Sequence, residues 1–293
     1  VSLSAMAPAL DTVIYLDIDG VLNVGIRDHG NAPLLLNEDN CTMALRFGDT
    51  SRLRQREREC IEKVISVVKR SFPGDTEAGT YRKYACTGKH QCSDILLHRV
   101  KQIIKAAGDG AHVVLASNWR KPKYVNKVML LEKEISKHLG RTFTFDSTTE
   151  VINENGAPDR LHCIGKHVRE ISSSTSHNGA LRLLVLDDFF VTPFNGWACE
   201  HCKITSSGDV EAYLKECAQC ADVSVKMVHC YEDWLTNEGY RVEVGTGLTA
   251  QHTAIALDFL VHTGCRRLSA SLTNGQPCAA EVAAAEKGAS IRE

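Results

Sequence analysis

Three short apolar runs along the chain share one design. Each is a block of β-favouring residues that stops at a small polar or acidic residue: 13–16 before Asp17, 113–116 before Ser117, and 183–186 before Asp187. Continuous apolar runs, unlike alternating ones, are typical of strands buried on both faces, as in a parallel sheet that helices cover. The pattern therefore predicts three buried strands, each with a polar side chain where it ends.

The connections between these runs contain apolar residues at helical spacing. Residues 92–107, closed by Gly108, and residues 125–139, closed by Gly140, have apolar side chains three or four positions apart. Strands that alternate with helices have right-handed crossovers, so the three strand ends fall on one edge of the sheet, where open parallel sheets bind ligands. We expect an α/β protein, Rossmann-like, with three α/β/α layers and a mainly parallel sheet.

Two long segments interrupt this pattern. We expect residues 1–268 to form one core domain and residues 269–293 to form a tail, either a peripheral helix or a frayed end. Residues 24–90 are too many for an ordinary connection, so we expect a cap or lid there, with a helix from about 57 to 70. Residues 191–235 carry a cysteine cluster and are expected to form a second insertion.

Composition and charge exclude several classes of protein. With 43% hydrophobic residues, a chain of 293 residues has enough apolar material for a large core. A net charge of −2 argues against a protein that coats nucleic acid or an anionic membrane, since both need a strongly positive surface. Twelve cysteines are too few for a short disulfide scaffold, and neither a membrane-spanning run nor a secretory signal is evident. We expect a soluble protein of a reducing intracellular compartment, the cytoplasm or the nucleus.

The segment after the first run carries the most specific chemistry. Asp17 and Asp19 are two positions apart, so in an extended chain both carboxylates face the same side. Two such groups can divide labour, because one attacks as a nucleophile while the other moves protons to and from the leaving group and water. Gly20 then lets the chain turn away with a freedom that other residues lack.

These residues resemble the first motif of the haloacid dehalogenase-like hydrolase superfamily, Asp-x-Asp-Gly-[Val/Thr]-Leu, and the resemblance covers roughly residues 12 to 261. The second motif is similar to Ser117-Asn118-Trp119-Arg120 and the fourth to Asp187-Asp188. Lys166, 21 positions before Asp187, is the best match to the lysine of the third motif. Residues 240–249 resemble the last strand and Gly-Leu-Thr turn of small members that carry Ser-x-Trp-Arg in their second motif.

The resemblance implies Mg²⁺-dependent phosphoryl transfer through an aspartyl-phosphate. Close carboxylates repel by about 4 kcal/mol per pair at an effective dielectric constant of ~20, and an oxygen-binding divalent ion such as Mg²⁺ removes that cost. The resemblance implies that Asp17 is the nucleophile and Asp19 the general acid and base, with Ser117 and Lys166 in contact with the phosphoryl group. The implied Mg²⁺ ligands are Asp17, Asp187, Asp188 and the Asp19 carbonyl. The implied substrate contacts are Gly20, Asn118 and Arg120.

Several of these roles have a structural alternative. Asp188 either binds the ion or only orients Asp187. Lys166 is either the phosphate-binding cation or an ordinary exposed lysine, in which case Lys121 or Lys123 supplies the charge.

The residues around the second motif leave two further questions open. Asn118 either lines the site or caps the following helix, and Trp119 either packs or contacts substrate. The basic residues Arg120, Lys121, Lys123 and Lys127 are a solvated strip, an attractor for a small anionic substrate, or a path for nucleic acid.

The cysteines of the second insertion have the spacing of a structural zinc site. Cys199 and Cys202, then Cys217 and Cys220, form two C-x₂-C pairs that a fourteen-residue spacer separates. Four thiolates at such spacing give Zn²⁺ its tetrahedral sulfur shell. Alternatively, residues 210–220 form a helix in which the last two cysteines are small core residues. The superfamily pattern does not call for this insertion.

The interpretation that best accounts for these patterns is a Mg²⁺-dependent phosphatase that acts on a phosphorylated small molecule or a nucleic-acid end. Phosphomutase chemistry uses the same two acids and stays open. The alternative from another class is a non-catalytic or nucleic-acid end-processing module, whose zinc-stabilised insertion and basic strip bind nucleic acid or a protein partner.

Overall fold

The three predicted strands are neighbours in one parallel sheet. The structure is a computed structural model that describes residues 11–26, 34–40, 84–151, 157–174, 180–188, 197–199, 202–204, 206–218, 222–235, 239 and 241–271. Its main sheet has five strands, in the order β5-β4-β1-β6-β9, and every pairing is parallel. Their bounds are β1 Asp11–Leu16, β4 His112–Leu115, β5 Ser147–Thr148, β6 Leu181–Asp187 and β9 Val223–His229. The predicted runs are β1, β4 and β6, so the central part of the sheet is confirmed.

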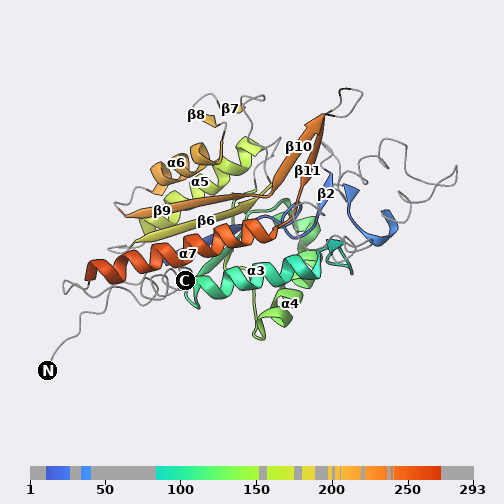
Figure 1. Ribbon diagram of the computed structural model, residues 1–293, viewed down its shortest axis with the longest axis horizontal. Coiled ribbons are helices and arrows are strands. Elements are labelled where there is room, and N and C mark those ends of the chain that lie inside the picture. The colour runs from blue at the N-terminus through green and yellow to red at the C-terminus, as the bar shows by residue number, and fades with distance from the viewer. Residues whose placement is uncertain are drawn as a thin grey trace, which may run out of the picture.

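Helices cover both faces of this sheet, which gives three layers. One face packs against α3 (Asp94–Ala107), α4 (Val125–Leu139) and α7 (Ala250–Ser271), and the other against α5 (Ala157–Ser174) and α6 (Ser207–Ala218). Figure 1 shows α5 and α6 on one side of β6 and β9, with α3 and α7 on the other. Because alternate strand residues face opposite sides, Ile14 and Leu16 join one core cluster while Val13 and Tyr15 join the other.

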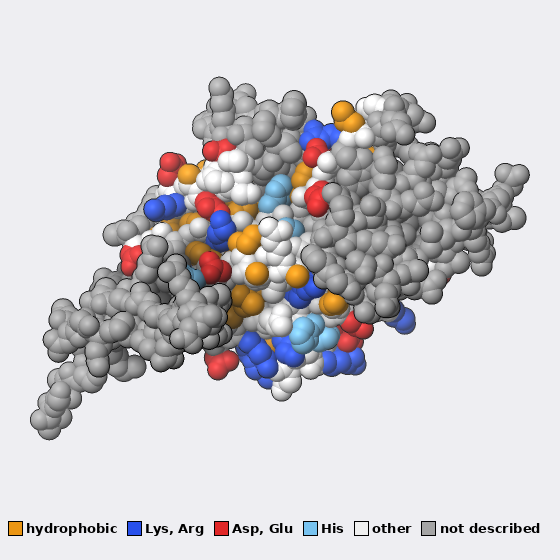
Figure 2. Space-filling model, in the orientation of Figure 1, with side chains coloured by type: hydrophobic (Ala, Val, Ile, Leu, Met, Phe, Trp, Pro, Cys, Tyr) orange, Lys and Arg blue, Asp and Glu red, His pale blue; other side chains and the backbone are white. Residues whose placement is uncertain are grey.

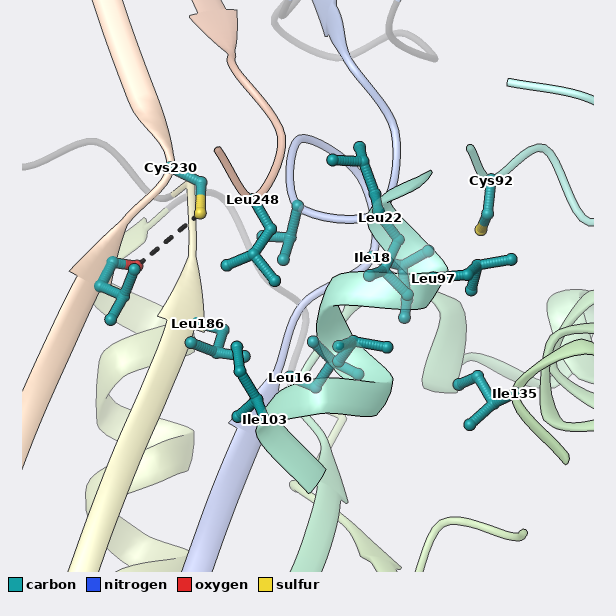
Figure 3. Packing of buried hydrophobic residues seen from close by; sticks show 14 of the residues in the cluster. Leu16, Ile18, Leu22, Cys92, Leu97, Ile103, Ile135, Leu186, Cys230 and Leu248 are labelled. Carbon is teal, nitrogen blue, oxygen red and sulfur yellow. Dashed lines mark hydrogen bonds between the residues drawn. The ribbon is translucent and has the colours of Figure 1, made fainter. Parts of the chain in front are cut away.

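The chain stays in the core for several residues after β1 ends. Leu16 and Leu186, from adjacent strands, lie near Ile103 of α3, and Ile18 and Leu22 pack beside them (Figure 3). All five side chains are fully buried. Because Ile18 points into this core, the two aspartates that flank it face away from it. Packing therefore fixes the segment that carries both carboxylates.

A second, antiparallel sheet continues from the end of β9. It has the order β10-β11-β2-β3, with bounds Tyr231–Leu235, Arg241–Gly245, Gly25–Ile26 and Leu34–Leu35. Cys230 alone separates β9 from β10, and in Figure 1 the β10–β11 pair extends beyond the parallel sheet. The two strands of the expected cap that the structure describes, β2 and β3, are therefore hydrogen-bonded to the core through β11. The expected helix at 57–70 lies outside the described residues.

The expected insertion at 191–235 differs from the structure. Residues 207–218 form α6 and residues 223–229 form β9, so both are core elements that complete the three layers. Residues 231–235 form β10 of the antiparallel sheet, and β7 (Trp197–Cys199) and β8 (Cys202–Ile204) form a short antiparallel pair. Likewise, α7 runs past the expected core limit at 268 to Ser271.

The surface carries both signs of charge. Figure 2 shows acidic and basic side chains interspersed on the visible face, with basic ones gathered at its lower edge, over α3 and α4. This mixture fits the net charge of −2. Within the described residues, no helix combines the length and apolar character that a membrane crossing requires.

The packing of β6 gives a test of the core. Leu184 is fully buried, whereas Leu235 at the end of β10 is 70% exposed. We expect Leu184→Ala to lower the free energy of unfolding by about 2–5 kcal/mol, because it opens a cavity, and Leu235→Ala to change it by less than about 0.5 kcal/mol. Urea denaturation of both variants measures the difference. Equal losses would contradict the assignment of β6 to the core.

Candidate functional site

Three buried carboxylates meet at the carboxyl ends of β1 and β6. Asp17 follows β1, Asp187 ends β6 and Asp188 comes next, and the three are 1%, 0% and 4% exposed. The strand register brings them together, since the Asp17 amide donates to the Leu186 carbonyl at 2.9 Å. Each offers a carboxylate oxygen within 4.8 Å of the others, and they are the one such group of potential metal ligands among the described residues. The predicted convergence of these three side chains is therefore observed.

Arg160 of α5 lies between these carboxylates. Its Nη1 donates to Asp17 Oδ2 and to Asp187 Oδ1, both at 2.8 Å, and is 3.9 Å from Asp188 Oδ1. Burial disfavours the charged guanidinium, but the carboxylates outweigh this effect and raise the pKa of Arg160 above its ordinary value. The guanidinium therefore stays charged and offsets part of the repulsion within the triad.

The residues present suit a divalent oxygen-binding cation. All three groups offer carboxylate oxygens, which Mg²⁺ prefers. Asp17 Oδ1 is buried and has no hydrogen-bond partner among the described residues. Three carboxylates this close repel one another, so a divalent cation bound between them is electrostatically favourable.

Lys166 does not join this cluster. Its ammonium donates to Glu150 at 2.5 Å, and the side chains of this ion pair are 45% and 48% exposed. That hydrogen bond raises the pKa of Lys166. Both cations are on α5, but six helical positions correspond to about 240° around the axis, so they face different directions. Arg160, and not Lys166, is therefore the cation in contact with the carboxylates, while the contact of Lys166 with a phosphoryl group stays a prediction.

The alternative lysines are not in the cluster either. Lys123 lies over the ring of Tyr124, 4.8 Å from its centre. Lys121 is the residue between two short 3₁₀ turns, η2 (Asn118–Arg120) and η3 (Pro122–Tyr124), and its amide donates to the Asn118 carbonyl.

Asp19 is held at both of its carboxylate oxygens. Asn23 Nδ2 donates to Oδ1 at 3.0 Å, and Trp119 Nε1 donates to Oδ2 at 2.8 Å. Asn23 is itself fixed, since its Oδ1 accepts from the Gly20 amide at 2.8 Å. Burial raises the pKa of Asp19 and repulsion from Asp17 adds to this, while the hydrogen bonds from Asn23 and Trp119 oppose it. A carboxyl group in this setting takes up a proton more readily than an exposed one.

Gly20 allows two parts of the chain to approach closely. Its φ is +82°, which glycine adopts without strain, and a Cβ at this position would lie 2.2 Å from Asp188 Oδ2. Gly245 of β11 packs against the same place, where an added Cβ would lie 2.2 Å from the Gly20 Cα and 2.9 Å from Asp188 Oδ2. The described contacts of Gly20 therefore give it a packing role, while its predicted contact with substrate stays a prediction.

The end of β4 lies beside these residues. The Ala116 amide donates to the Leu16 carbonyl at 2.9 Å, so Ser117 follows β4 next to the end of β1. Ser117 is fully buried and is the N-cap residue of η2, where its Oγ accepts from the Trp119 amide at 3.4 Å. The capping role considered for Asn118 is thus performed by Ser117. Asn118 Oδ1 is buried without a hydrogen-bond partner in the part of the chain described.

Arg120 holds the loops around the site. Its Nη1 donates to the carbonyls of Ala116 and Ser117, at 3.2 and 2.6 Å, and its Nε donates to the Glu150 carbonyl at 3.1 Å. Burial, with some repulsion from Arg160, lowers the pKa of Arg120. These contacts join the end of β4 to the chain after β5, so Arg120 fixes these loops, while its predicted contact with substrate stays a prediction.

The four cysteines of the predicted zinc site are only partly described. Cys199 and Cys202 are directly opposite each other in the β7–β8 pair. Cys217 is buried near the end of α6 in the core cluster that α5 and α6 form, and Cys220 lies outside the described residues. The surroundings of Cys217 match the core role considered for it, and the zinc site stays a prediction.

Comparison with known proteins gives no match to this chain, whether with protein-family models, with curated proteins or with solved structures.

Sequence reasoning missed Arg160, although a signal for it was present. Arg160, Ile164 and Val168 are spaced four residues apart, and all three are buried on one face of α5. An arginine in an apolar row of a helix needs a buried partner, and the acidic triad provides one. The hydrogen bonds of Asn23 and Trp119 to Asp19 had no such local signal.

The two cations of α5 give a matched test of this site. We expect Arg160→Met to lower the free energy of unfolding by about 3–5 kcal/mol in metal-free buffer, because it leaves buried carboxylates without their counter-ion. Lys166→Met should have little effect, since its ion pair is exposed to solvent. Urea denaturation with a chelator present measures both. A larger loss for Lys166→Met would mean that Arg160 is not the counter-ion of the triad.

Proposed function

We propose that the protein is a Mg²⁺-dependent phosphomonoester hydrolase of the haloacid dehalogenase-like superfamily, in which Asp17 accepts the phosphoryl group. The observation that carries this proposal is the meeting of Asp17, Asp187 and Asp188 at one sheet edge, with Asp19 held by neutral donors two residues further on. A nucleophile, a cation site and a proton donor within one short segment and its neighbouring strand are the parts that phosphoryl transfer through an enzyme carboxylate needs.

The first step forms a bond between a carboxylate oxygen of Asp17 and phosphorus. As the bond from phosphorus to the leaving oxygen breaks, Asp19 donates a proton to that oxygen, and the alcohol departs. Asp17 Oδ2 already accepts from Arg160, while Oδ1 has no partner among the described residues. The unequal contacts of the two oxygens allow one to stay paired while the other reacts or binds the ion.

The second step releases phosphate. Asp19, now a carboxylate, removes a proton from water as the water oxygen attacks phosphorus, and the bond to Asp17 breaks. This returns both side chains to their starting protonation states and leaves inorganic phosphate. The use of one carboxyl as acid and then as base requires that it stay near the reacting oxygen through both steps, and the hydrogen bonds at both oxygens of Asp19 support this.

Positive charge around the phosphoryl group has two sources in this proposal. Asp17, Asp187 and Asp188 would hold Mg²⁺, and the bound ion would neutralise charge on these carboxylates and on the phosphoryl oxygens. Arg160 supplies the second cation, in the role that sequence reasoning gave to Lys166, and it is already within 2.8 Å of the nucleophile. Ser117, buried at the end of the adjacent strand, is the proposed hydroxyl donor to a phosphoryl oxygen.

We also propose that segment 24–90 acts as a cap and that Cys199, Cys202, Cys217 and Cys220 hold a structural zinc ion. The pairing of β2 with β11, whose Gly245 packs against Gly20, supports a cap beside the site. The facing positions of Cys199 and Cys202 across β7–β8 support a shared metal. Elemental analysis of the purified protein tests the second point.

Removal of the nucleophile is the direct test of the proposed reaction. We expect Asp17→Asn to lower phosphate release from p-nitrophenyl phosphate with Mg²⁺ by on the order of 10⁴-fold or more, because an amide does not form the aspartyl-phosphate. The control is Asp109→Asn, an exposed carboxylate paired with Arg141, which should keep full activity. The proposal fails if the wild type releases no phosphate from a broad panel of phosphate esters, or if the two variants are equally active.

Metal binding can be measured without turnover. We expect Mg²⁺ to bind the wild-type protein in isothermal titration calorimetry and to stabilise it, by about 2.7 kcal/mol at 100 times the Kd. Asp187→Asn should lose both effects, because it removes a ligand oxygen, whereas the exposed Asp258→Asn should retain them. Retention of Mg²⁺ binding by Asp187→Asn would place the metal site elsewhere.

A further inference from the structure

A closed ring of contacts links Asp19 to Lys127 by two routes. On one side, Trp119 Nε1 donates to Asp19 Oδ2 at 2.8 Å, and Lys127 Nζ lies over the same indole, 5.0 Å from the ring centre. On the other side, Asn23 Nδ2 donates to Asp19 Oδ1 at 3.0 Å and to the Gln91 carbonyl at 3.2 Å. Lys127 closes the ring by donating to Gln91 Oε1 at 2.6 Å.

The conformation of Gln91 is what closes this ring. Its φ is +54°, and it is the only non-glycine residue with a positive φ in the described part of the chain. A side chain with this backbone conformation is strained, so the surrounding contacts must hold it there. In this conformation the Gln91 carbonyl meets Asn23 while its side-chain amide meets Lys127. The strained backbone conformation of Gln91 thus allows this one residue to contact both Asn23 and Lys127.

Lys127 has a physical means to act on Asp19 without touching it. A cation over the face of an indole is attracted to the ring electrons and draws them toward itself, which makes the ring N–H a stronger donor. That N–H is the group that holds Asp19 Oδ2. Trp119 is 2% exposed, so water does not replace this hydrogen bond readily.

We propose that Lys127 is a positioning residue for Asp19, and that through Trp119 and Gln91 it holds this carboxyl where it protonates the leaving oxygen. The inference rests on the proposed phosphatase function and deepens it. Both oxygens of Asp19 accept hydrogen bonds from different elements, so rotation of the carboxyl breaks at least one of them. Loss of Lys127 weakens one donor and frees the side chain of Gln91, which loosens both sides of the ring.

Lys123 provides a matched control. It is four residues before Lys127, and its Nζ also lies over an aromatic ring, 4.8 Å from the centre of the Tyr124 ring. Its ring partner Tyr124 stacks on Trp119, whereas Lys127 lies over Trp119 itself and donates to Gln91. A lysine that only attracts anionic substrate through long-range charge would be replaced at similar cost at either position.

The test compares two substrates that differ in their need for a proton. p-Nitrophenyl phosphate has a leaving group that departs as an anion, whereas an alkyl phosphate needs protonation of its leaving oxygen. The wild-type protein and the Lys127→Met, Lys127→Arg and Lys123→Met variants are assayed with Mg²⁺ for kcat/KM on both esters. This constant reports phosphoryl transfer and is unaffected by later release of phosphate.

We expect Lys127→Met to lower kcat/KM for the alkyl ester by at least about 10-fold, part of the roughly 10²–10⁴-fold that general acid catalysis contributes, and to change the aryl ester little. Lys127→Arg should restore the alkyl activity, because it keeps a cation over the indole. Lys123→Met should behave as the wild type on both esters.

Other outcomes overturn the inference in distinguishable ways. Equal losses of Lys127→Met on both esters, seen as a raised KM, would make Lys127 a substrate-binding residue, and no loss on either would make it an ordinary surface lysine. If the wild-type protein turns over neither ester, the proposed function fails and takes this inference with it. The melting temperature of each variant, measured in the same buffer, identifies any loss that comes from unfolding.

Discussion

The mutual repulsion of three carboxylates, buried where two parallel strands end, is the constraint on which this site depends. Charges this close and this poorly hydrated destabilise the folded state unless a cation meets them. Arg160 reaches them from α5, on the opposite side of β1 and β6 from α3, and pairs with Asp17 and Asp187. The strand register, the rotation of α5 and the buried arginine therefore form one unit, because a shift in any of them leaves charge uncompensated.

Close backbone packing keeps this unit in place. Gly20 and Gly245 approach each other so nearly that neither tolerates a side chain, and Asp188 fills the space beside them. This contact joins the segment after β1 to β11, which pairs with β2, and β2 pairs with β3. The position of the antiparallel sheet is therefore fixed relative to the acidic triad. Because β2 is hydrogen-bonded to β11, which packs beside the site, and β3 to β2, both strands are held in place. Any movement of the proposed cap would therefore involve other residues of the segment 24–90.

The sequence predicts the parts of this design that repeat a local pattern. Continuous apolar runs identify β1, β4 and β6, and the right-handed crossover rule brings Asp17, Ser117 and Asp187 to one edge. The choice between Arg160 and Lys166 depends on the rotation of α5, which distance along the chain from Asp187 does not report. The segment 207–229 is predicted as part of an insertion from its cysteine spacing, whereas its apolar residues make α6 and β9 core elements. The ring of contacts around Asp19 joins residues that are far apart in the sequence, between Asp19 and Lys127. It depends on a positive φ at Gln91, which no local sequence pattern predicts.

The two aspartates of the first motif differ in which charge each one meets directly. Asp17 accepts a hydrogen bond from a guanidinium ion, whereas Asp19 accepts from an amide and an indole, both neutral, and meets the cation of Lys127 only across the indole ring. Neutral donors in a buried setting compensate burial only in part, and burial raises the pKa of Asp19. The proposed division of labour, with Asp17 as nucleophile and Asp19 as proton carrier, thus follows from placing the same functional group in two electrostatic environments within three residues of chain.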